Sequence, residues 1–100
     1  MPSNDPIQRL DDILENIARI RTYVEPMDET AFVQDAKTRD AVERCIERIA
    51  EAARKLGEAF DADYPGLDLP ALRRLGSVLR HDYGGVQPAL LWGFVGNRLA

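Results

Sequence analysis

The chain has 100 residues, of which 45% are hydrophobic and 30% are charged. This balance is typical of one folded domain covering residues 1–100, and it excludes a disordered chain. The net charge of −4 argues against a protein that coats nucleic acid with its whole surface. Residues 1–63 carry nine basic and fifteen acidic side chains, whereas residues 64–100 carry four arginines and two aspartates. Local anion binding in the C-terminal third therefore stays open.

The sequence lacks the features of membrane proteins and of metal sites. Its longest apolar run, residues 89–95, is far shorter than the roughly 20 residues that a membrane-spanning helix needs, and the N-terminus lacks a signal-peptide pattern. Cys45 is the single cysteine and His81 the single histidine, so one chain cannot supply a structural zinc site. We expect a cytoplasmic protein with no membrane contact, no metal and no cofactor.

Two long amphipathic helices are predicted in the first 60 residues. The first covers residues 6–24, where Asp5 caps the N-terminus, Gln8 completes a capping box and Pro26 ends the helix. Its apolar residues recur at intervals of three or four. They are Ile7, Leu10, Leu14, Ile17, Ile20 and Val24. A short turn or a single helical turn over residues 28–35 carries Phe32, and a second helix with the same periodicity covers residues 37–60. Its other face is charged and includes the favourable pairs Asp40 with Arg44 and Glu51 with Lys55.

The C-terminal third begins with a loop over residues 61–68 that contains a Pro-Gly turn and ends at Asp68, which is placed to cap the next helix. That helix starts at Leu69 or Pro70 and ends before Gly84-Gly85, and a last helix begins near Pro88. No segment shows the period-two alternation of a strand. The sequence therefore predicts an all-α fold, an up-and-down bundle of about four to five helices.

The candidate chemistry lies between Arg73 and Tyr83. His81 has an ordinary pKa near 6.5, so it can accept and donate a proton at neutral pH. Arg74 lies seven residues earlier, which is close to two helical turns, so the two positions share one helix face. A fixed cation beside a titratable imidazole suits cleavage of a phosphodiester, and RNA supplies its own nucleophile, the 2′-OH. The alternative is that His81 only interacts with the helix C-terminus. Glu51 is a candidate partner for either residue.

The order Arg74, six residues, His81, Asp82 and Tyr83 resembles the Arg-x(4–6)-His-x-Tyr signature of HEPN-domain proteins, in particular the HepT-like family. Residues 40–56 are similar to the second long helix of that family. The segment Tyr64-Pro65-Gly66-Leu67 and residues 79–86 match its later pattern. The resemblance covers the chain from residue 7 to about residue 95.

The resemblance implies a helical homodimer whose Arg and His meet at the interface to form a metal-independent endoribonuclease, the toxin of a toxin-antitoxin pair. It also implies a minimal nucleotidyltransferase (MNT) as antitoxin, which can transfer AMP to the motif tyrosine, here Tyr83. On this interpretation Arg74 and His81 are catalytic, and Arg73 and Arg80 bind the phosphates of the RNA substrate.

This chain departs from the family pattern at two positions. Many members carry Arg-Asn five and four residues before the histidine, where this sequence has Gly76 and Ser77. The catalytic arginine is then Arg74, or its role passes to Arg80 or Arg73. The departure and the net acidity favour a second hypothesis, a non-catalytic module that docks a nucleotidyltransferase. A plain helical dimerisation protein is the third.

Overall fold

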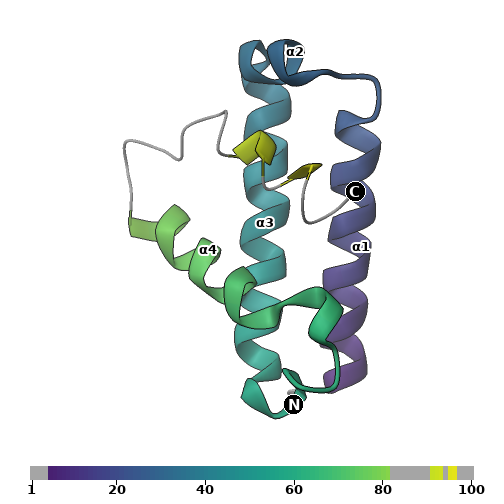
Figure 1. The fold of residues 1–100 in the computed structure, drawn as a ribbon, viewed down its shortest axis with the longest axis vertical. Helices are drawn as coiled ribbons and strands as arrows, with labels where there is room; N and C mark the ends of the chain where they lie inside the picture. The colour runs from purple at the N-terminus through teal and green to yellow at the C-terminus, as the bar shows by residue number, and fades with distance from the viewer. Residues whose placement is uncertain (1–4, 82–90, 94, 97–100) are drawn as a thin grey trace.

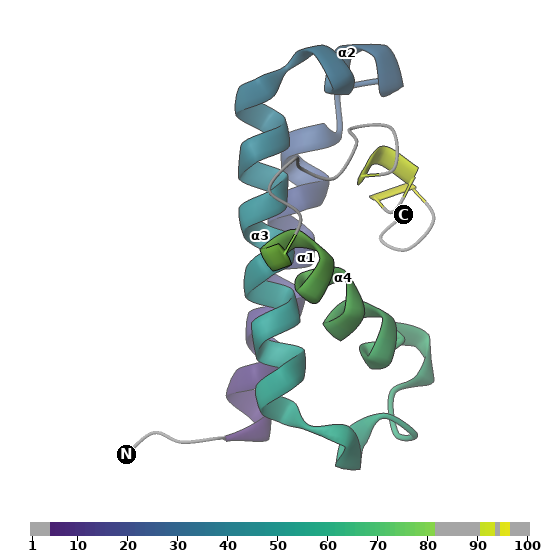
Figure 2. The same ribbon diagram turned by 90° about the vertical axis from the view of Figure 1, so that its left-hand side faces the viewer.

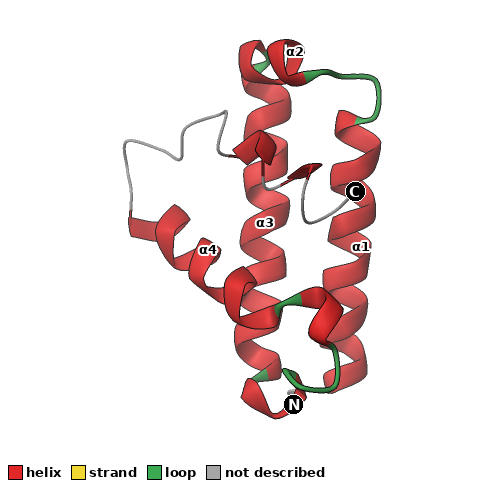
Figure 3. Cartoon of the chain, viewed as in Figure 1, coloured by secondary structure: helices red, strands yellow, loops and turns green. Residues whose placement is uncertain are grey.

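The computed structural model describes residues 5–81, 91–93 and 95–96. The described residues form helices and connecting turns, in agreement with the all-α prediction (Figures 1 and 3). Three long α-helices and three shorter helical segments follow one another up to residue 81. They are α1 (Pro6–Val24), α2 (Glu29–Gln34), α3 (Ala36–Leu56), the 3-10 helices η1 (Glu58–Phe60) and η2 (Pro65–Leu67), and α4 (Leu69–His81). Residues 91–93 and 95–96 are also helical.

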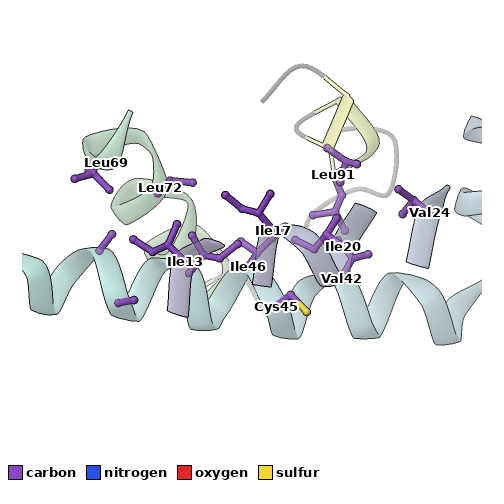
Figure 4. Close-up of a cluster of buried hydrophobic side chains, with 14 of the residues drawn as sticks. Ile13, Ile17, Ile20, Val24, Val42, Cys45, Ile46, Leu69, Leu72 and Leu91 are labelled. Atoms are coloured by element: carbon purple, nitrogen blue, oxygen red, sulfur yellow. The ribbon is translucent and has the colours of Figure 1, made fainter. Parts of the chain in front are cut away.

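The long helices α1 and α3 lie side by side and antiparallel, and α2 joins them at one end (Figure 1). Helix α4 crosses α3 obliquely, on the same side of the α1–α3 pair as the helical residues 91–93 and 95–96 (Figure 2). The core fills the space between these elements (Figure 4). Its fully enclosed large side chains are Phe32, Ile13, Ile20, Ile46, Ile49, Leu69, Leu91 and Val42. Thus α4 is held against the bundle by residues on its inward face.

Helix α1 has the predicted bounds, and Ile17, Ile20 and Val24 of its predicted apolar face are buried, but the first half of the helix differs from the prediction. Asp5 caps it by accepting a hydrogen bond of 3.0 Å from the Ile7 amide. Ile13 is fully buried, whereas Leu14 and Ile7 are 56% and 69% exposed. One residue turns a helix by about 100°, so the contact with α3 selects one stripe and leaves the neighbouring one in solvent. The predicted capping box is wrong, because the Gln8 amide donates to Asp12 instead.

Of the two structures predicted for residues 28–35, a turn or a single helical turn, the chain forms the helical one, the short helix α2, which is followed directly by α3. Asp28 caps α2 by accepting from the Ala31 amide, and Asp35 caps α3 by accepting from both the amide and the hydroxyl of Thr38. These hydrogen bonds lower the pKa of Asp35 from its ordinary value. Phe32 of α2 is fully buried, and its ring lies 5.2 Å from the Trp92 ring. Trp92 is partly buried and packs against the core.

Helix α3 ends at Leu56, four residues before the predicted end at Phe60. Gly57 stops it with φ 81° and ψ −179°, while its amide still donates to the Ala53 carbonyl. Phe60 keeps its place against the core from the 3-10 helix η1. The apolar residues keep their helical spacing across Gly57, so the periodicity of the sequence alone did not show that α3 ends there. On the charged face, Glu51 lies 3.8 Å from Lys55 as predicted, but Arg44 pairs with Glu47 rather than Asp40.

Replacing Gly57 should destabilise the fold through the backbone alone. A Cβ at this position would meet no atom within 4 Å, but φ is +81°. That conformation costs about 1–3 kcal/mol for a residue with a side chain. We expect Gly57→Ala to lower the free energy of unfolding by this amount in urea titrations. Gly66→Ala is the matched control, because position 66 is equally open and has no positive φ. Equal stability of the two variants would contradict the argument.

The loop before α4 behaves largely as predicted. It contains the 3-10 helix η2, and Asp68 follows with φ 51°, the left-handed conformation. The Asp68 carboxylate accepts from the Ala71 amide at 3.4 Å, so the predicted cap of α4 is confirmed. Leu69 and Leu72 are buried, and Leu75 packs against the core from a partly exposed position. Helix α4 therefore reaches its last residue, His81, as a continuous helix.

Candidate functional site on helix α4

Arg74 and His81 lie on one uninterrupted helix, as the sequence predicts. Seven residues at 100° each fall about 20° short of two full turns, and the rise between the two positions is about 10.5 Å. The backbone register therefore sets positions 74 and 81 on one face. The side chains of Arg80 and His81 lie outside the described part of the structure, as does Tyr83 entirely. The roles predicted for these three residues stay predictions.

Arg74 is exposed and stands apart from the packed side of α4. Within the part of the chain that the structure describes, its guanidinium makes neither a hydrogen bond nor an ion pair. Gly76 is buried and Ser77 is half-buried. Two residues turn the helix by about 200°, so position 76 faces the core while Arg74 faces outward. Of the two candidate arginines whose side chains the structure describes, Arg73 and Arg74, Arg74 is the more exposed and therefore the more accessible to an anion.

The adjacent Arg73 has a different environment. Its Nη2 lies 2.7 Å and its Nη1 3.2 Å from the two carboxylate oxygens of Asp61, which makes a two-point ion pair. Nη1 also donates to the Ala53 carbonyl at 3.4 Å. The side chains of Arg73 and Asp61 are 21% and 25% exposed. The hydrogen bond with Asp61 raises the pKa of Arg73 further, so the guanidinium is a permanent cation.

These contacts give Arg73 a role that sequence reasoning missed. They connect α4 to η1 and to the last turn of α3, where the C-terminus of a helix favours a cation. Asp61 lies twelve residues from Arg73 in an irregular segment, and no regular spacing indicates such a pair. The phosphate contact predicted for Arg73 stays a prediction, although the ion pair holds both of its terminal nitrogens.

The ion pairs of Glu51 that the structure describes are with residues of its own helix, whereas its predicted partnership with His81 lies outside the described side chains. Its carboxylate lies 2.6 Å from Arg54 Nη2 and 3.8 Å from Lys55 Nζ. It also lines a polar cleft of about 500 Å³ between α1 and α3. Four arginines and four acidic residues surround this cleft, together with Asn16 and Ala52. The charged ones are Arg9, Asp12, Glu15, Arg19, Arg44, Glu47, Arg48 and Glu51. None of the α4 side chains that the structure describes, Arg74 included, lines this cleft.

The described residues contain neither a cluster of metal-binding side chains nor a helix suited to span a membrane. In this part of the chain, no three His, Cys, Asp or Glu side chains come close enough to hold a metal ion. None of its helices has the length and hydrophobicity that a bilayer span requires. The predicted absence of a metal in the mechanism stays a prediction, because the side chain of His81 is outside this description.

Known proteins resemble this chain over nearly its full length. A family model named HepT-like, with the description "Ribonuclease HepT-like", matches residues 13–100. This range includes the whole of α4 and the positions of Arg74, His81 and Tyr83. No solved structure was found to match the chain.

Three related proteins illustrate the similarity. "Putative RNase MJ0127" of Methanocaldococcus jannaschii is 36% identical over 99 residues, which cover 99% of this chain and 82% of the relative. "Putative RNase MJ1216" of the same organism is 32% identical, over 92% of this chain and 76% of the relative. "Probable ribonuclease HepT" of Thermococcus cleftensis is 32% identical, over 83% of this chain and 76% of the relative.

Proposed function

Because the chain belongs to the HepT-like ribonuclease family, we propose that it is an endoribonuclease whose active site lies on the outward face of α4. The observation that carries this proposal is the placement of Arg74. It is an exposed arginine without a partner among the described residues, and it stands in register with the single histidine of the sequence. Cations of a phosphate site must be accessible, and Arg74 meets that requirement.

The proposed reaction needs a proton acceptor, a cation and the substrate itself. His81 takes the proton of a 2′-OH, whose oxygen attacks the adjacent phosphorus while the bond to the 5′-oxygen breaks. The leaving oxygen receives a proton, and a 2′,3′-cyclic phosphate remains. Arg74 stabilises the charge that accumulates on the phosphate oxygens in the transition state. Arg80, one residue before His81, contributes further positive charge along the RNA backbone.

The finer parts of the proposal follow from the family resemblance. A homodimer would bring the α4 faces of two chains together, so that two Arg74–His81 pairs line one groove. A minimal nucleotidyltransferase would act as antitoxin and could transfer AMP to Tyr83. An added phosphate two residues from His81 would put negative charge where the substrate phosphate must bind, and nearby arginines would retain it there.

The test of this function is cleavage by the purified wild-type protein in EDTA, with total tRNA and messenger RNA as substrates. We expect fragments that end in 2′,3′-cyclic phosphate, because the nucleophile belongs to the RNA and the base is His81. Fragments that form only after a divalent metal is added would contradict the metal-independent mechanism. Absence of cleavage by folded, unmodified protein would contradict the enzyme assignment.

Arg74→Ala should reduce kcat/KM for RNA about 100-fold, because it removes a charged donor that acts on the transition state. The matched control is Arg48→Ala. Arg48 is also exposed on a helix and makes no hydrogen bond or ion pair with the described residues, but it lies in the α1–α3 cleft. The two variants lose the same charge, so equal activities would mean that Arg74 contributes only to the overall charge.

A non-catalytic module that docks a nucleotidyltransferase remains the second candidate, and one observation favours it. Position 76, where the family pattern given in the sequence analysis has arginine, is a buried glycine in this chain. This hypothesis predicts a stable complex with the transferase and no cleavage of RNA by the isolated protein. Cleavage that depends on Arg74 and His81 would exclude it.

A further inference from the structure

Among the side chains of helix α4 that the structure describes, apolar residues and an ion pair both hold the helix to the rest of the domain. Leu69 and Leu72 are buried in the core. On another side, Arg73 forms the two-point ion pair with Asp61 and the hydrogen bond to the Ala53 carbonyl. A planar guanidinium held at both terminal nitrogens fixes an orientation as well as a distance. The ion pair therefore resists rotation and tilting of α4 on α3.

Small movements at this attachment would be enlarged at the other end of the helix. Residues 73 and 81 are eight positions apart, so they are separated by about 12 Å along the axis. A tilt of about 10° at residue 73 would displace residue 81 by about 2 Å. A misplacement of about 1 Å can reduce a reaction rate about 100-fold. Arg74 is adjacent to Arg73 and would turn with it.

We propose that Arg73 is a positioning residue which, through its ion pair with Asp61, sets the orientation of α4 and so of the Arg74 and His81 positions. This inference rests on the proposed ribonuclease function. It assigns Arg73 a contact with the protein in place of one with RNA, and it adds Asp61 to the residues on which activity depends. Neither residue needs to touch the substrate.

The two roles of Arg73 predict opposite effects of Asp61→Asn. If Arg73 binds phosphate, loss of the neighbouring negative charge should strengthen RNA binding, so KM should fall while kcat stays unchanged. If Arg73 positions α4, the weakened ion pair should lower kcat about tenfold or more, while KM changes less than about twofold. A pair that only stabilises the fold would lower Tm and leave both constants unchanged at temperatures well below unfolding.

The experiment measures kcat, KM and Tm for the wild type, Asp61→Asn and two controls. Asp63→Asn removes the same charge from an exposed residue of the same loop that makes no side-chain contact with the described residues. It should match the wild type. Asp61→Glu keeps the carboxylate and should retain most of kcat, which also tests the proposal if Asp61→Asn does not fold. Loss of kcat in Asp63→Asn, or an unchanged kcat in Asp61→Asn, would overturn the proposal.

A readout without RNA separates this proposal from the proposed function. His81 is the only histidine, so its imidazole gives one assignable NMR signal. We expect that signal to shift in Asp61→Asn and to stay in place in Asp63→Asn, even if the wild type proves inactive on RNA. An inactive wild type would contradict the ribonuclease function alone. An unmoved signal in Asp61→Asn would contradict the positioning role.

Discussion

His81→Ala is expected to reduce RNA cleavage at least about 100-fold, because general acid–base catalysis by a positioned side chain contributes about 10² to 10⁴ to a rate. The measurement is single-turnover cleavage of tRNA and messenger RNA in EDTA, with excess enzyme so that binding does not limit the rate. The residual rate should lose the bell-shaped or sigmoidal pH dependence that titration of an imidazole gives near its ordinary pKa of about 6.5.

Two controls make the loss interpretable. Circular dichroism and thermal unfolding should show that the variant retains its fold. Free imidazole added to His81→Ala should restore part of the rate, because a small base can occupy the space that the side chain leaves. A variant that cleaves RNA at the wild-type rate would show that another residue or a contaminating nuclease is responsible.

Phe32→Ala should cause the largest loss of stability. The side chain is fully buried and lies against the Trp92 ring with an angle of 41° between the ring planes. Removal of a buried phenylalanine typically costs about 3–5 kcal/mol, and a single domain has only about 5–15 kcal/mol in total. In a chain of this size the melting temperature should fall by more than about 12 °C. Thermal and urea unfolding, monitored by circular dichroism, measure both quantities.

Tyr64→Ala is the control for Phe32→Ala, since it also removes an aromatic ring but from a side chain that is 39% exposed. We expect it to change stability much less. A small effect of Phe32→Ala would mean that α2 contributes little to the core, contrary to its packing. The contact also joins α2 to the helical residues 91–93, so near-ultraviolet circular dichroism of Trp92 should change in the variant.

Much of the fold could be predicted because its elements follow local rules. Helix α1 has the predicted bounds, and Asp5 and Asp68 cap helices as expected. Capping depends on a few neighbouring atoms, so it can be recognised in the sequence. The choice between Ile13 and Leu14 as the buried residue depended on where α3 lies. The packing of α1 against α3 therefore determines which of these two side chains is buried.

The candidate site was predicted less completely, and Arg73 shows why. In the sequence, Arg73 and Arg74 are adjacent cations, and both were predicted to act on phosphate groups of the RNA. The structure gives the first an ion pair with Asp61 and leaves the second exposed, since adjacent helix positions point about 100° apart. The partner of Arg73 comes from an irregular loop whose path depends on Gly57 and on the turn at Asp68. Pairs of this kind have no characteristic spacing.

The described part of the structure also separates the two charged regions of the molecule. The α1–α3 cleft is lined by as many acidic residues as arginines, and none of the described α4 side chains lines it. Its arginines mostly pair with acidic residues of their own helix, as Arg19 does with Glu15 at 2.8 Å. Such pairs leave little net field to attract RNA. The exposed Arg74 is therefore the better candidate for binding phosphate.

The antiparallel pairing of α1 and α3 also has a consequence for how the chain folds. The two helices are connected by a short segment, so they can meet after closing a short loop, and low contact order favours fast folding. Helix α4 follows both in the sequence and packs on a surface that they create. A nascent chain would thus hold its first two long helices together before α4 docks. The proposed catalytic helix would therefore be positioned only after the α1–α3 pair has formed.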